Sequence, residues 1–170
     1  MVISGSLGCA SGPEEQLPPS QPTDPVVYKQ RMRDLVISLS DYARTFNSEF
    51  IVIPQNGNEL LTVNGNLAAA PALDYIQAID GIGREDLFYG YSADNRETPP
   101  EALRYMLAYL ALALEHELTV LVIDYCRQPS KIDESYGRNR REGFISFAAP
   151  RRDLTVIPGY PDPVFAEHPG

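Results

Sequence analysis

One short stretch, residues 119–125, constrains the fold more than any other part of this sequence. It reads Thr-Val-Leu-Val-Ile-Asp-Tyr, so it is apolar along almost its whole length and shows no helical period. A strand that is apolar on both faces is typical of a buried parallel sheet. Three further short apolar stretches, 50–54, 78–82 and 144–148, predict companion strands.

The segments between these strands mostly predict helices. Apolar residues recur at steps of three and four over 32–46, which predicts an amphipathic helix of about four turns. Residues 58–72 give a looser helical stretch, and a further turn runs through Tyr75.

A third helix is expected from Thr98 to Leu114, with Thr98 as its N-cap and Glu101 three residues later. The polar segment 127–142 predicts an irregular connection before the last strand.

Alternating helices and buried strands predict an α/β fold with a parallel sheet, either doubly wound or closed into a (β/α)8 barrel. Gly81 and Gly83 supply only two glycines of the dinucleotide-binding fingerprint, which argues against the doubly wound form. We therefore expect about four strand–helix units of a barrel. A complete barrel usually needs about 250 residues, and this chain has 170.

Composition bounds the domain and its partners. With 44% hydrophobic residues the chain can bury one core, which we place at 26–162, between a Pro-rich tail at 1–25 and a tail at 163–170. A formal net charge of -9 argues against nucleic acid. No stretch reaches the ~20 apolar residues of a membrane span.

Cysteine and histidine are too few for a disulfide framework or a zinc site. The chain has two of each, and Cys126 is expected to be a small core residue. We expect no metal and no cofactor.

The candidate site residues follow the predicted strands, because ligands of parallel α/β folds bind beyond the carboxyl ends of the strands. The candidates are Gln55, Asn56, Glu85, Tyr89, Asp124, Tyr125 and Arg151. Amides, carboxylates and aromatic rings in one group suit a polyhydroxylated, sugar-like substrate. Each residue also has a structural alternative: a plain turn, a first-turn acid, a salt bridge or a core aromatic.

Cleavage of a glycoside needs two carboxylates on opposite sides of the bond. Glu85 and Asp124 form one such pair from the sequence, or one catalytic acid and one binding residue.

Four segments, 50–57, 79–89, 120–126 and 143–151, resemble glycoside hydrolase family 114, and the resemblance covers roughly 26–162. It implies strands five to eight of a (β/α)8 barrel and an endo-α-1,4-polygalactosaminidase activity.

The resemblance also implies roles for single residues. Glu85 would be one of two catalytic carboxylates, and the other, an Asp ending the fourth strand, would precede residue 26. Asn56, Asp124 and Tyr125 would line the subsites. The implied substrate is an extracellular galactosamine-containing polysaccharide, whose cationic form the negative charge of the chain would suit.

Three hypotheses remain open. The chain is a glycosidase domain of a longer parent protein, a half-barrel that binds a polysaccharide without cutting it, or an inactive fragment. An open half-barrel exposes sheet edges, so self-association is expected. An extracellular or cell-surface location follows from the resemblance, with Cys9, which follows Gly8 near the start of the chain, as a candidate lipidation site.

Overall fold

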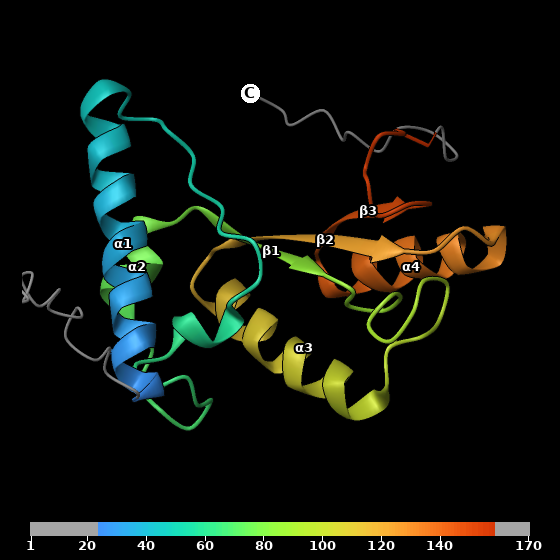
Figure 1. Cartoon of the computed structure of the whole chain (residues 1–170), viewed down its shortest axis with the longest axis horizontal. Helices are drawn as coiled ribbons and strands as arrows, with labels where there is room; N and C mark the ends of the chain where they lie inside the picture. The colour runs from blue at the N-terminus through green and yellow to red at the C-terminus, as the bar shows by residue number, and fades with distance from the viewer. Residues whose placement is uncertain (1–23, 159–170) are drawn as a thin grey trace, which may run out of the picture.

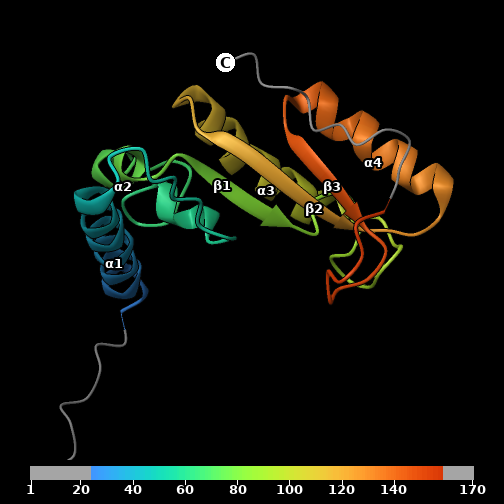
Figure 2. The same cartoon turned by 90° about the horizontal axis from the view of Figure 1, so that it is seen from above.

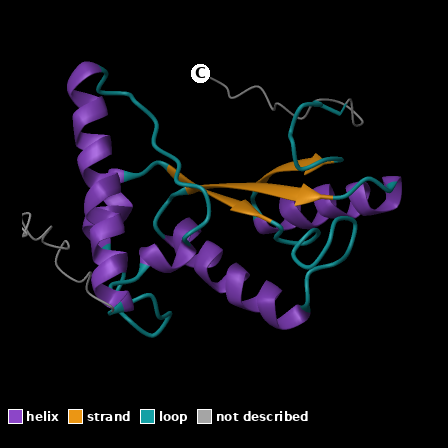
Figure 3. Cartoon of the chain, in the orientation of Figure 1, coloured by secondary structure: helices purple, strands orange, loops and turns teal. Residues whose placement is uncertain are grey.

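A computed structural model describes residues 24–158 of the chain. It contains a three-stranded parallel sheet with the strand order β1-β2-β3 (Figure 1, Figure 3). The strands are β1 (Gly81–Glu85), β2 (Thr119–Tyr125) and β3 (Ile145–Ala149). The α/β class predicted from the alternation of elements is confirmed.

Within the described residues, four α-helices and one 3-10 helix accompany the sheet. They are α1 (Pro25–Phe46), η1 (Asn58–Leu61), α2 (Leu73–Ala78), α3 (Pro100–Glu115) and α4 (Pro129–Glu142). The side chain of Asp24 caps α1 by accepting a hydrogen bond from the Val26 amide at 2.9 Å. Gly143, with a φ of 80°, ends α4 in the left-handed conformation that glycine tolerates best.

The two faces of the sheet differ. Val120 and Val122 of β2 are buried in the same cluster as Met106 and Leu110 of α3. Successive side chains of a strand point to opposite faces, so the alternate residues 121, 123 and 125 lie on the other face. No described helix packs on that other face (Figure 2). We call it the open face.

The strand predicted at 50–54 is wrong. These residues run beside β1 without forming a strand, and the next residue, Gln55, makes an isolated bridge with Gly83. Val52 and Pro54 accept backbone hydrogen bonds from Asp80 and Gly83. Pro54 has no amide hydrogen to donate to a second neighbour, and 50–53 have no described strand on their outer side.

The second strand was predicted too early, at 78–82. Helix α2 continues to Ala78, and β1 begins only at Gly81. Between them, the carboxylate of Asp80 accepts hydrogen bonds from the Val52 amide at 2.7 Å and from Arg44 at 2.9 Å. Asp80 thus lies at a bend between α2 and β1.

The helix predictions need two smaller corrections. The looser helical stretch at 58–72 is one 3-10 turn, η1, followed by turns and an antiparallel bridge between Thr62 and Pro71. Thr98 is not the N-cap of α3. Pro99 holds that position, and the Thr98 hydroxyl donates instead to the backbone oxygen of Asp86 at 3.0 Å.

The segment 127–142, predicted to be irregular, is mostly the helix α4. Its inward side chains include the fully buried Ser135 and Asn139, which are polar. The sequence of such a helix lacks a clear apolar stripe, because part of its buried face consists of polar side chains that form hydrogen bonds.

Helix α1 is confirmed, but its packing face is unexpected. Arg33 and Ser40 are buried, and Arg33 donates to the backbone oxygens of Thr62 and Val63 at 2.9 and 2.7 Å. Most of the apolar residues that predicted this helix therefore face away from the domain.

Two further observations concern partners and ligands. No helix within 24–158 is long and apolar enough to cross a membrane. In the same range, no three His, Cys, Asp or Glu side chains gather closely enough to hold a metal ion. Cys126 is buried in the core as a free thiol, as predicted.

Candidate functional site

Glu85 is the last residue of β1 and stands beside the carboxyl end of β2. The hydroxyl of Tyr125 donates a hydrogen bond to Oε1 of Glu85 at 3.2 Å. Tyr125 lies two residues beyond Ile123, the register partner of Glu85, so both side chains stand on the open face. Two of the candidates predicted from the sequence are therefore in direct contact.

Asn56 and Gln55 join Glu85 from the segment beside β1. The Asn56 side-chain oxygen accepts a hydrogen bond from the Glu85 amide at 3.1 Å, and the Asn56 amide donates to the Gly83 oxygen at 2.7 Å. The Gln55 side chain lies over Gly83, where an added Cβ would collide with its Oε1. Glycine at 83 thus makes room for Gln55 next to Glu85.

The arginine that reaches this group is Arg152, which was not predicted. Arg151 points outward, 65% exposed, and pairs with Asp153. The Arg152 guanidinium lies 4.2 Å above the centre of the Tyr125 ring, a cation–π distance. It also donates to Oδ1 of Asp94 at 2.6 Å. Nothing in a run of two arginines shows which one turns toward the sheet.

Two acidic residues on the loop after β1 hold Arg152. In addition to the Asp94 contact, it donates to Oδ1 of Asp86 at 3.3 Å and to the Gly90 oxygen at 2.8 Å. Burial raises the pKa of Asp86, and the charge of Arg152 partly offsets this. The rim beside Glu85 therefore carries more acidic than basic groups.

Tyr125 is held in its protonated form. Burial, followed by the neighbouring Glu85 carboxylate, raises the pKa of Tyr125 to about 12. At neutral pH the phenol is thus protonated and donates its hydrogen bond to Glu85. The charge of Arg152 acts to lower the pKa of Tyr125, but it does not outweigh the other two effects.

Asp124 does not share the open face. Oδ1 accepts hydrogen bonds from the backbone amides of Phe88 and Tyr89 at 2.8 and 3.1 Å. Oδ2 accepts from Ser135 at 2.6 Å and from Asn139 at 3.2 Å. Burial raises the pKa of Asp124, and these four donors partly counter the effect. The carboxylate faces α4, on the opposite side of β2 from Tyr125.

Tyr89 is also separated from the group. Its side chain is fully buried in the core. Burial and the neighbouring Glu134 raise its pKa. A ring in this position packs against the domain rather than against a ligand.

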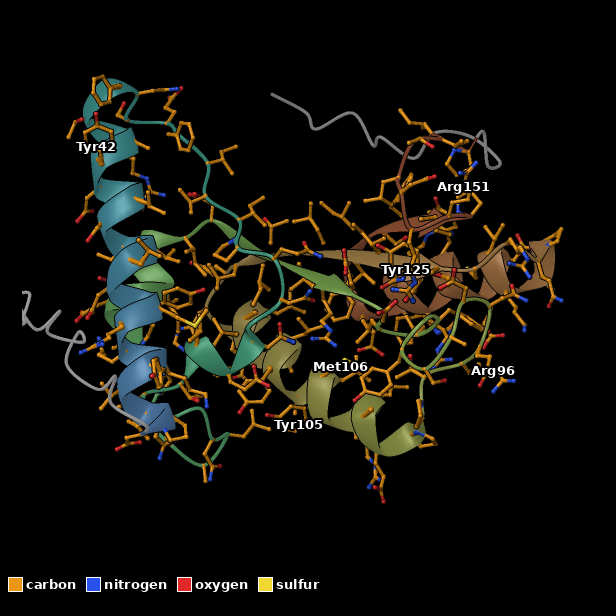
Figure 4. The ribbon with its side chains drawn as sticks, viewed as in Figure 1. Tyr42, Arg96, Tyr105, Met106, Tyr125 and Arg151 are labelled. Carbon is orange, nitrogen blue, oxygen red and sulfur yellow. The ribbon has the colours of Figure 1, made fainter. Side chains whose placement is uncertain are left out.

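The residues that come together are Gln55, Asn56, Glu85, Tyr125 and Arg152. Figure 4 shows Tyr125 at the carboxyl end of β2, with Arg151 beyond β3. The group offers one carboxylate, two amides, a phenol and a guanidinium. These are donors and acceptors that can bind hydroxyl groups and exchange a proton with a bound substrate.

Comparison with known proteins gives two relatives. The chain is 31% identical to an uncharacterized protein of Deinococcus radiodurans over 116 residues, which are 68% of this chain and 34% of that protein. It is 30% identical to an uncharacterized protein of Methanocaldococcus jannaschii over 120 residues, 69% of this chain and 31% of that protein. The chain thus spans about a third of the length of these relatives. No protein-family model matches the sequence.

Proposed function

We propose that this chain is part of a glycosidase that hydrolyses α-1,4 linkages in an extracellular galactosamine-containing polysaccharide by acid/base catalysis. One observation carries the proposal. The Glu85 carboxylate stands at the carboxyl end of a parallel strand and is oriented by the Tyr125 hydroxyl at 3.2 Å. Strand-end carboxylates of this kind perform the chemistry in (β/α)8 enzymes.

The one-sided sheet supports a barrel rather than a doubly wound fold. Helices α3 and α4 lie on the same face of the sheet, and the open face carries the half-buried apolar residues Leu121, Ile123 and Phe147. A doubly wound sheet has helices on both faces, whereas a barrel turns one apolar face inward. We place β1, β2 and β3 as strands six to eight, with 50–55 in the position of strand five.

Glu85 acts in this proposal as the general acid and base. It protonates the oxygen of the leaving sugar as the glycosidic bond breaks and the second carboxylate bonds to the anomeric carbon. It then takes a proton from the water that displaces this carboxylate. Because the phenol of Tyr125 occupies Oε1, proton exchange with the substrate falls to Oε2. Tyr125 is thus a positioning residue, and Asn56 restrains the backbone that carries Glu85.

Asp124 is not the second catalytic carboxylate of this proposal, because four hydrogen bonds keep it on the helix side of β2. In the proposed reaction the second carboxylate is the Asp that the resemblance implies at the end of strand four. The position of Asp124 away from Glu85 favours one alternative, in which the chain binds the polysaccharide through the open face but does not cleave it.

The rim favours a cationic sugar. The three carboxylates of Glu85, Asp86 and Asp94 lie near two guanidinium groups, those of Arg84 and Arg152, so acidic groups outnumber basic ones. A partially deacetylated aminosugar polymer carries ammonium groups that such a rim attracts, which agrees with the net charge of -9. An extracellular or cell-surface location, with Cys9 as a lipidation site, is part of the proposal.

The purified parent protein, which in this proposal carries both carboxylates, tests this function when it is incubated with partially deacetylated galactosaminogalactan. We expect soluble oligosaccharides from the wild type and from Glu49→Gln, a control on an exposed turn, but none from Glu85→Gln. Polymer binding without release would support the non-cleaving alternative. A folded wild-type chain that neither binds nor cleaves the polymer would refute both forms of the proposal.

A further inference from the structure

A continuous apolar stripe runs along the outer side of α1. Its six residues are Tyr28, Met32, Leu35, Leu39, Tyr42 and Phe46, which we call the α1 stripe. Their exposed fractions rise from 40% for Tyr28 to 76% for Phe46. A stripe this long on a helix surface indicates an interaction site.

The spacing of the stripe fits another helix. Its residues follow one another at alternating steps of four and three, the a/d pattern of a coiled coil. Arg33 and Ser40, which are buried against the domain, lie on the opposite side of the helix. Within 24–158 no other element covers the α1 stripe, so a partner helix can pack along it without disturbing the described contacts of α1.

The area of the stripe matches a stable interface. Fully exposed side chains of these types present about 150–250 Å² each, and the six residues are 40–76% exposed. Together they offer on the order of 500–900 Å², comparable with the ~800 Å² that each partner contributes in a specific complex.

The stripe is complementary to itself when one helix is reversed. Its alternating steps read the same in both directions, so Leu35 of one helix meets Leu39 of the other. In the same register Met32 meets Tyr42 and Tyr28 meets Phe46. The centre is then an aliphatic pair, flanked by sulfur–aromatic and aromatic–aromatic contacts.

Charge selects the reversed arrangement over the parallel one. Arg31 lies beside the stripe near the start of α1 and would come close to its own copy in a parallel pair, and the first turn of the helix holds no acidic residue. Parallel helices would bring these cations together, whereas reversed helices separate them and align the helix dipoles favourably. We propose that two copies of this chain associate through antiparallel packing of the α1 stripe.

This association is independent of the proposed glycosidase site. Tyr42 lies at the far end of the molecule from Tyr125 (Figure 4). The Tyr42 and Phe46 rings already contact each other edge to face, with centroids 5.1 Å apart, so one end of the stripe is organised before a partner binds. Loss of the dimer and loss of activity are therefore separable results.

Sedimentation equilibrium over a hundredfold range of protein concentration tests the association. We expect a dimer for the wild type and a monomer for the Leu35→Glu, Leu39→Glu double variant, with an unchanged circular dichroism spectrum. The control is Ile157→Glu, an equally apolar and 78% exposed position away from α1, which should stay dimeric. A wild type that is monomeric throughout would overturn the proposal and point to a partner outside this chain.

Cysteine pairing tests the direction of the helices and does not depend on the glutamate variants. In a Cys9→Ser background, Met32→Cys and Tyr42→Cys chains are oxidised separately and as a mixture. The antiparallel register predicts a cross-linked dimer only in the mixture, because equivalent residues lie far apart. Cross-linking of either variant alone, or none in the mixture, would overturn the antiparallel arrangement.

Discussion

Replacing Asp124 with alanine should destabilise the chain more than any other single loss of a carboxylate. Oδ1 accepts two backbone amides and Oδ2 accepts Ser135 and Asn139, with all four distances between 2.6 and 3.2 Å. Asn139 keeps a second acceptor, the Ser135 oxygen at 3.0 Å. The other three donors would lie buried without an acceptor.

The magnitude follows from these three donors. A buried donor left unsatisfied costs about 1–3 kcal/mol, and the removed carboxylate returns part of its own desolvation cost. We therefore expect Asp124→Ala to lose about 3–5 kcal/mol of unfolding free energy, a large share of the ~5–15 kcal/mol of a typical domain.

Asp124→Asn should lose less than half as much. It keeps an acceptor for the Phe88 and Tyr89 amides, and its new amide group can donate to the Asn139 oxygen. That oxygen is buried without a hydrogen-bond partner among the described residues.

Urea unfolding followed by circular dichroism measures both variants, with the exposed Asp41→Ala as a control. A loss below about 1 kcal/mol for Asp124→Ala would refute the structural role. So would an asparagine variant as unstable as the alanine variant. A loss of polysaccharide binding in a fully stable variant would instead restore Asp124 as a substrate-binding residue.

Three further predictions follow from pKa values and packing. Because burial raises the pKa of Asp124 above 3.8, protonation favours the folded state. The difference in unfolding free energy between the wild type and Asp124→Asn should then shrink as pH rises through that pKa. Urea unfolding from about pH 3 to pH 7 measures this difference, and a constant difference would contradict the prediction. Gly83→Ala should displace Gln55, weakening polymer binding while shifting the thermal midpoint by only a few degrees; unchanged binding would argue against Gln55. Burial raises the pKa of Cys126 to about 12, so in a Cys9→Ser background the thiol should react with a disulfide reagent only after urea is added, and fast reaction in buffer would contradict its burial.

The sequence was most informative where apolar area decides the structure. Strand β2 occupies the predicted residues 119–125, because a short stretch that is apolar on both faces has few alternatives. The helix α4 was missed for the complementary reason. Its buried Ser135 hydroxyl and Asn139 side-chain amide group donate to Asp124, a partner more than ten residues away along the chain.

The candidate site was predictable by position but not by direction. Glu85, Asn56 and Tyr125 were chosen because they follow strands, and the structure brings them together. Which of two adjacent residues faces the site depends on the alternation of side chains at the end of a strand. The alternation turns Asp124 toward α4, and the loop after β3 selects Arg152 over Arg151.

Arg152 has a consequence for the order in which the molecule assembles. It follows β3, yet its guanidinium contacts Asp86 across 66 residues of chain, over the end of β2 that lies between them. Contacts this distant in sequence form late, because the loop that joins them must first lose its freedom. The surroundings of Tyr125 are then completed only when the last strand has docked, and they are the first to open when that strand frays. Nascent chains should therefore pair β1 with β2 before they acquire a finished site.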